Sequence, residues 1–141
     1  KTYTSEHYDQ LLASGEVVLA HAWGGPVARA MAERPSIRYV VPKEGATLWA
    51  DCLVVLRTAP QKQLAMRFIN YLMEPHVAAR TSERLRFASA SRSARELVNA
   101  STRDNPAVYP PLDQLDRLEW MTDVGRGVRL YDRAWTELKM Q

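Results

Sequence analysis

Apolar residues in the first half of the chain recur with helical spacing in some stretches and as short continuous runs in others. The first predicted helix has the apolar stripe Tyr8, Leu11 and Leu12; it begins at a cap, Thr4 or Ser5, and ends before Gly15. The pattern then predicts a strand over 17–21, a helix from Pro26 to about Arg34, a strand over 37–41 and an extended stretch over 48–56. The apolar run at 53–56 is too continuous for a surface strand, so it is expected to be buried.

The second half of the chain reads as mainly helical. The pattern predicts a helix from Pro60, with Leu64, Phe68 and Leu72 on one face beside Ala65, Ile69 and Met73. It then predicts a helix from Pro75 to about Arg84, a loop over 89–93, a helical piece capped by Ser93 that runs through Val98, and a loop over 105–111. The last predicted helix starts at about Asp123 and has the apolar stripe Val124, Val128, Tyr131, Trp135 and Leu138. Strands that alternate with helices indicate an α/β protein.

Composition narrows the class of protein without identifying it. The 141 residues are 46% hydrophobic and 25% charged, which is ordinary for a soluble globular protein. The net charge of +3 is spread along the chain, and no run of Lys and Arg is interleaved with aromatics. Nucleic acid is therefore not an expected partner.

Candidate metal, redox and targeting features are sparse. Cys52 is the only cysteine, which excludes an internal disulfide. His7, His21 and His76 are too widely separated to have metal-ligand spacing. No apolar run approaches the ~20 residues that span a membrane, and no signal peptide is visible. A start at Lys1 without Met suits a processed or excerpted polypeptide.

The chain carries no pattern typical of a catalytic site. Ser14-Gly15 and Ser91 lack the context of a nucleophile elbow, and no glycine-rich loop matches a phosphate cradle. We therefore expect neither enzymatic activity nor a cofactor.

The segment 48–51 is more informative. In an extended stretch, Trp49 and Asp51 project from the same face, which pairs an aromatic ring with a carboxylate. That combination suits an alkylammonium group, because the carboxylate supplies charge and the indole a cation–π contact. Trp23, beside a glycine turn, is a candidate for a second aromatic wall of such a ligand site. In the alternative interpretation both tryptophans fill the core, and Asp51 caps a turn or pairs with an Arg.

Several short strings then occur together in a fixed order. They are LASGE at 12–16 followed by AHAWGG at 20–25, VVPKEGA at 40–46 with LWAD at 48–51, RFINYL at 67–72, and EW at 119–120 with DVG at 123–125. With these strings the chain resembles the periplasmic spermidine/putrescine-binding proteins, the solute-binding receptors of ABC importers. The resemblance implies an α/β chain that forms part of a bilobed periplasmic-binding-protein-like fold, incomplete here, and a periplasmic location.

The resemblance also implies a mechanism and a set of ligand contacts. The receptor closes on a polyamine such as putrescine or spermidine and delivers it to the membrane permease, with no bond made and no cofactor. Trp23, Trp49 and Asp51 align with family ligand contacts. Phe87 stands where spermidine receptors usually carry a Tyr, and Met121 where they often carry a Gln. Pro26 replaces an Asp of some relatives. These three departures each remove a polar partner.

The family pattern further implies how the chain is divided between lobes. Residues 1–48 are assigned to the second lobe, 49–92 to a crossover and the first lobe, and 93–141 to the return into the second lobe and the C-terminal helix. The likeness covers only about the last two fifths of a receptor, so the expected partners include the missing N-terminal part or another copy of the chain. Alternative interpretations are a receptor for an amino-acid-like or opine amine, with Arg86 near its carboxylate, and a non-binding structural fragment.

Overall fold

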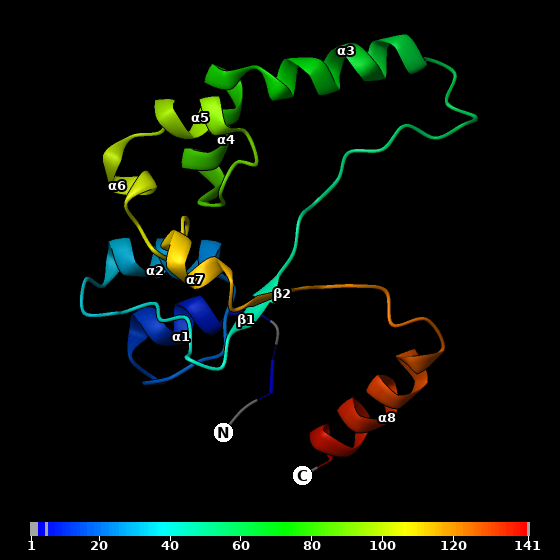
Figure 1. The fold of residues 1–141 in the computed structure, drawn as a ribbon. Helices are drawn as coiled ribbons and strands as arrows, with labels where there is room; N and C mark the ends of the chain where they lie inside the picture. Colours follow the sequence, from blue (N-terminus) through cyan, green and yellow to red (C-terminus); the bar gives the residue numbers. More distant parts are fainter. Residues whose placement is uncertain (1–2, 5, 141) are drawn as a thin grey trace.

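The computed structural model describes residues 3–4 and 6–140 and combines short helices with one small parallel sheet (Figure 1). Its elements are α1 (Tyr8–Ser14), α2 (Gly24–Glu33), β1 (Ala46–Leu48), α3 (Lys62–Met73), α4 (Pro75–Leu85), α5 (Arg92–Leu97), α6 (Ala100–Arg103), α7 (Leu112–Leu115), β2 (Leu118–Trp120), η1 (Gly125–Gly127) and α8 (Val128–Lys139). The predicted α/β class is confirmed.

The sheet joins two segments that are far apart in the sequence. β1 pairs in parallel with β2, with Ala46 opposite Leu118 and Leu48 opposite Trp120. Gly45 leads into β1 with φ of 105°, and a side chain on it would collide with the carbonyl oxygen of Arg117. Glycine at this position therefore permits both the left-handed turn and the close approach of the two strands. The sequence pattern did not predict β2, which is three residues long.

Helix ends follow local chemistry, with some differences from prediction. Gly15 ends α1 with φ of 86°, and its N–H reaches the carbonyl oxygens of the last turn, as predicted. The start was predicted wrongly at Thr4, because His7 is the N-cap with φ of 60° and the Thr4 hydroxyl instead bonds the backbone of Glu6. The alternative cap, Ser5, lies outside the described residues.

The later helices are largely where the pattern placed them. α4 runs from Pro75 as predicted, while α3 begins at Lys62 rather than at Pro60. Ser91, not Ser93, caps α5, since its hydroxyl accepts a bond from the backbone N–H of Ala94. The last helix was expected from about Asp123 but starts at Val128. The Asp123 carboxylate accepts a bond from the Gly125 N–H, and this turn leads into η1 first.

The strands predicted over 17–21 and 37–41 are not formed, and the extended stretch 48–56 is a strand only at its first residue. The prediction that 53–56 is buried is wrong, because Leu53, Val54 and Leu56 are exposed. A strand requires a neighbour that pairs with its backbone, and no described residue supplies one to these segments. Val18 is accordingly 98% exposed and Leu19 is 87% exposed.

Two predicted apolar stripes lie at the surface. On α3, Leu64 and Phe68 are exposed while Ala65 and Ile69 are half-buried. On α8, the members Val128, Tyr131 and Trp135 are all exposed. Both helices lie at the periphery of the view in Figure 1, away from α1, α2 and the sheet.

The buried core includes two small clusters in the described part of the chain. One contains Ala28, Ala107 and Val108, and the other contains Ala79, Ala94 and Val98. Tyr109 packs against both clusters and so joins α2 to the α4–α5 pair.

Candidate functional site

Three aromatic rings predicted as ligand contacts or neighbours of them meet in one cluster. The ring of Trp49 lies with its centroid 5.5 Å from that of Trp23 and 5.6 Å from that of Phe87. The interplanar angles are 80° and 68°, so both contacts are edge-to-face. We call Trp23, Trp49 and Phe87 the aromatic cluster.

Each ring comes from a different element. Trp49 directly follows the last residue of β1, Trp23 is the N-cap of α2, and Phe87 follows Arg86, the C-cap of α4. Arg86 has φ of 60°, and its guanidinium donates a 2.6 Å hydrogen bond to the hydroxyl of the buried Thr102. This contact holds a residue in the left-handed region, where the chain turns out of the helix toward the cluster.

Met121 lies at the same edge of the sheet. It follows the last residue of β2, and its N–H donates a 2.8 Å hydrogen bond to the carbonyl oxygen of Leu48. Because the carboxyl ends of parallel strands meet at one edge, Met121 lies beside the residue that leads into Trp49. The Met121 side chain is 59% exposed.

Asp51 lies two residues beyond Trp49, and its side chain is exposed. It makes no salt bridge and no side-chain hydrogen bond with any residue in the described part of the chain. The alternative interpretation, in which Asp51 caps a turn or pairs with an Arg, therefore has no contact to support it. The rings are not fully buried either, since Trp23 is 39% exposed and Trp49 and Phe87 are half-buried.

Glycine at the start of α2 allows Phe87 to approach. A Cβ added to Gly25 would lie 2.5 Å from the Phe87 ring, well inside van der Waals contact. A side chain on Gly24 would collide with the carbonyl oxygen of Ala107. The sequence pattern interpreted this pair as a turn, whereas both glycines belong to α2 and serve close packing.

Hydroxyl groups fix the backbone at Phe87 and just after it. The Ser82 hydroxyl donates a 2.6 Å bond to the carbonyl oxygen of Phe87 and lies 3.0 Å from the Tyr109 hydroxyl. The Tyr109 oxygen also accepts a 3.1 Å bond from the N–H of Ser89. We call Ser82 and Tyr109 the hydroxyl clamp. Neither residue was predicted from the sequence, and no spacing signal marks them, since Tyr109 lies in a proline-rich loop.

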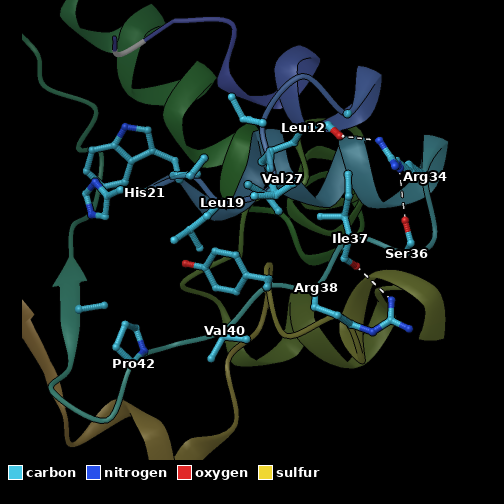
Figure 2. A pocket seen from close by; sticks show the side chains of 18 of the residues that line it. Leu12, Leu19, His21, Val27, Arg34, Ser36, Ile37, Arg38, Val40 and Pro42 are labelled. Atoms are coloured by element: carbon cyan, nitrogen blue, oxygen red, sulfur yellow. Dashed lines mark hydrogen bonds between the residues drawn. The ribbon is translucent and has the colours of Figure 1, made fainter. Parts of the chain in front are cut away.

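A groove of about 860 Å³ (Figure 2) is lined in part by Trp23, which also belongs to the aromatic cluster. Its walls are residues 17–23 and 36–40, with contributions from Leu12, Gly15, Val27, Arg34, Pro42, Ala46 and Thr47. Figure 2 shows Leu19 and His21 from the first wall and Ile37 and Val40 from the second. Among the described residues, no Asp or Glu lines this groove.

Two tyrosines beside the groove are shielded from water. Burial raises the pKa of Tyr39, and the neighbouring Tyr8 adds to this effect. Burial also raises the pKa of Tyr8, against a backbone hydrogen bond at Trp23 that lowers it. Both phenols are therefore neutral over the physiological range of pH.

Neither a metal site nor a membrane span is found where the structure describes the chain. Residues 3–4 and 6–140 contain no group of three or more His, Cys, Asp or Glu side chains that could hold a metal ion. No helix within these residues has the length and apolar character needed to cross a bilayer.

Comparison with known proteins gives consistent matches. A family described as bacterial extracellular solute-binding protein matches residues 1–110. The chain is 30% identical to spermidine/putrescine-binding periplasmic protein 1 of Haemophilus influenzae, over 98% of this chain and 38% of that protein. It is 33% identical to the putrescine-binding periplasmic protein PotF of Escherichia coli and 31% identical to a putrescine/agmatine-binding protein of Pseudomonas aeruginosa, each over 97% of this chain and 39% of the relative.

These matches confirm the family resemblance and limit what it covers. The family match includes Trp23, Trp49, Asp51 and Phe87, whereas Met121 lies beyond it. The chain spans 38 to 39% of the length of these curated relatives. This chain belongs to the family of bacterial extracellular solute-binding proteins.

Proposed function

We propose that the chain is the carboxyl-terminal part of an extracytoplasmic receptor that binds a small polyamine-like cation and delivers it to an ABC importer. The observation that carries the proposal is the meeting of Trp23, Trp49 and Phe87 at the carboxyl edge of the parallel sheet. In open α/β sheets, ligands bind outside the carboxyl ends of the strands. The names of the relatives, which are putrescine- and spermidine-binding proteins, suggest the class of ligand.

The chemistry of the cluster suits an alkylammonium group. Because the Trp23 and Trp49 rings lie nearly at right angles, their faces point in different directions. A cation placed over one of these faces gains a cation–π interaction of ~0.5–2 kcal/mol. Trp23, however, is the N-cap of α2, where the helix dipole is positive and disfavours a cation. A carboxylate is needed to outweigh that end of the dipole, and Asp51 is the exposed candidate two residues beyond Trp49.

The proposed mechanism is closure without chemistry. In this proposal, residues 1–48 and 93–141 belong to the second lobe, and residues 49–92 cross to the first. A ligand favours the closed state only by the free energy of contacts made with both lobes in that state. No covalent bond changes, and the closed receptor is the form that the importer recognises in the periplasm.

A receptor for an opine-like ligand is less well supported. Such a ligand carries a carboxylate, for which Arg86 was the nearest candidate. The Arg86 guanidinium already donates a 2.6 Å bond to the buried Thr102 hydroxyl, so its use for a ligand would break this contact.

The test is Asp51→Asn in the complete receptor, which keeps the shape and removes the charge. Loss of one partner of a desolvated charge pair costs ~2–5 kcal/mol, or roughly thirtyfold or more in the dissociation constant. Isothermal titration calorimetry with putrescine measures this change in the dissociation constant. Asp113→Asn, an exposed carboxylate in the first turn of α7, is the matched control and should leave the affinity unchanged. Equal affinity of the Asp51 variant and the wild type would contradict the proposal.

A further inference from the structure

An arginine occupies a backbone conformation that usually belongs to glycine. Arg86 is the C-cap of α4, and its φ of 60° with ψ of 36° places it in the left-handed region. A residue with a Cβ is disfavoured in this region, and helices that end in it commonly do so on glycine. Among the described residues other than glycine, only His7 also has a positive φ. A contact of the Arg86 side chain must therefore offset the cost of this conformation.

That contact is made with a fully buried hydroxyl group. The Arg86 guanidinium donates a 2.6 Å hydrogen bond to Oγ1 of Thr102, whose exposed fraction is 0%. Within residues 3–4 and 6–140, no carboxylate lies close enough to Arg86 to form an ion pair. The Thr102 hydroxyl is therefore the group that fixes the direction of this half-buried side chain.

Thr102 is itself held in place relative to α4. It lies in α6, where the side-chain oxygen of the N-cap Asn99 accepts a 3.0 Å hydrogen bond from the Thr102 N–H. The Asn99 N–H in turn donates a 2.8 Å bond to the carboxylate of Glu83 in α4. These contacts start on α4 at Glu83, pass through α6 and return to the end of α4 at Arg86. The end of α4 is thus braced against α6 at two points.

The turn that this brace fixes carries the Phe87 ring. Arg86 directly precedes Phe87, so its φ and ψ set the direction in which the chain leaves α4 toward the aromatic cluster. The ring lies 5.6 Å from that of Trp49, and a Cβ added to Gly25 would lie only 2.5 Å from it. With so little free space around the ring, its contact with Trp49 depends on the conformation of Arg86.

We infer that Arg86 and Thr102 are positioning residues for the ligand site, which hold the Phe87 ring against Trp49 and act through that ring. The inference rests on the proposed function in that it takes the aromatic cluster as the place where the cation binds. It gives Arg86 a role opposite to the one that its charge suggests. A cationic side chain near a cation site lowers affinity by repulsion, whereas a positioning residue raises it. The sign of the change on removing the guanidinium therefore separates the two roles.

The first test observes the Phe87 ring in the complete receptor without any ligand. With 4-fluorophenylalanine incorporated at position 87, ¹⁹F NMR reports the ring's contact with Trp49. Arg86→Gly adopts the left-handed turn without cost but is no longer held in it, so the resonance should move or broaden. Thr102→Val keeps the shape of the side chain and removes the acceptor, and should have the same effect. Thr102→Ser restores the hydroxyl and should restore the wild-type resonance.

The second test measures the affinity of the same variants for putrescine by titration calorimetry. A hydrogen bond to a charged group is worth about tenfold or more in an equilibrium constant, so Arg86→Gly and Thr102→Val should each weaken binding by about that factor. The double variant should bind no more weakly than either single variant, because both remove the same contact. Arg84→Gln is the matched control, since it removes the same charge from an exposed position on α4 and should leave the resonance unmoved and binding no weaker.

The outcomes separate positioning from a merely structural role and from the proposed function itself. Tighter binding of putrescine by Arg86→Gly would overturn the inference, because Arg86 would then act through its charge. An unmoved resonance in both Arg86→Gly and Thr102→Val would also overturn it. If Thr102→Val does not fold, the comparison of Arg86→Gly with Arg84→Gln still decides. A wild-type receptor that does not bind putrescine, with the resonance moving as expected, would support the positioning of Phe87 and contradict the proposed ligand instead.

Discussion

The hydroxyl oxygens of Tyr109 and Ser82 lie 3.0 Å apart, and this contact links the buried core to the aromatic cluster. The Tyr109 ring packs against both core clusters, while Ser82 holds the backbone carbonyl of Phe87. The position of the Phe87 ring therefore depends on a residue that does not itself belong to the cluster.

Tyr109→Phe should weaken ligand binding as well as stability. The change keeps the ring in the core and removes the oxygen that contacts Ser82 and Ser89. Leaving such partners unsatisfied costs about 1–3 kcal/mol of unfolding free energy. If the hydroxyl clamp positions Phe87, the affinity of the complete receptor for putrescine should also fall several-fold, as measured by titration calorimetry.

Tyr131→Phe is the control, because Tyr131 is 65% exposed on α8. This variant should change neither the stability nor the affinity for putrescine. A Tyr109 variant that loses stability but binds putrescine with wild-type affinity would limit the clamp to a structural role.

Gly25→Ala should displace Phe87, since the added methyl would lie 2.5 Å from the ring. Overpacking of this kind costs about 1–3 kcal/mol, against a helix-propensity gain of about 1 kcal/mol for Ala over Gly. We expect a net loss of stability and a change in the near-ultraviolet circular dichroism of the neighbouring tryptophans.

Gly127→Ala is the matched glycine control, because its added methyl would meet only the Val124 side chain at an ordinary 3.8 Å. Combining Gly25→Ala with Phe87→Leu should recover part of the lost stability by making room. An additive loss in the double variant would show that the methyl strains something other than the ring.

Ligand selectivity should follow the two residues that lack polar groups at the sheet edge. The far end of a long triamine needs partners in a closed site, and neither Phe87 nor Met121 offers the hydroxyl or amide that would supply them. We expect the complete receptor to show no strong preference for spermidine over putrescine. Phe87→Tyr combined with Met121→Gln should improve spermidine binding more than putrescine binding. An equal effect on both ligands would indicate that the two residues lie behind the site.

Stability should decline at alkaline pH through Tyr39. Burial raises the pKa of this phenol above its ordinary value of 10.0, so the folded chain holds the proton more tightly than the unfolded chain. The contribution is fully present below pH 10 and is lost as pH rises toward the folded-state pKa. Tyr39→Phe should flatten the fall in unfolding free energy above pH 10 in denaturant titrations. Tyr131→Phe should keep the wild-type slope.

Local signals predicted the helices well, and long-range partners explain most of the errors. Gly15 and Pro75 mark helix boundaries through backbone conformations that depend only on nearby residues. The segments 17–21 and 37–41 have strand composition, but pairing needs a neighbour that these described residues do not provide. β2 went unpredicted for the converse reason, since its partner β1 supplies what its own short sequence does not.

The candidate site was predicted in part. The spacing of Trp49 and Asp51, together with Trp23 beside a glycine pair, pointed to two of the three rings that lie in contact, and the family resemblance pointed to the third, Phe87. Ser82 and Tyr109 could not have been found, because a serine in a helix and a tyrosine among prolines acquire a role only when α4 and the loop at 105–111 meet.

The pairing of Ala46 with Leu118 also bears on the order of folding. Joining strands so distant in the sequence requires closing a long loop, which lowers the folding rate, whereas α3, α4 and α5 adjoin in the sequence and meet through local contacts. The contacts among α3, α4 and α5 should therefore form early and the sheet late. Trp49 directly follows β1, so its indole fluorescence would report the formation of the sheet.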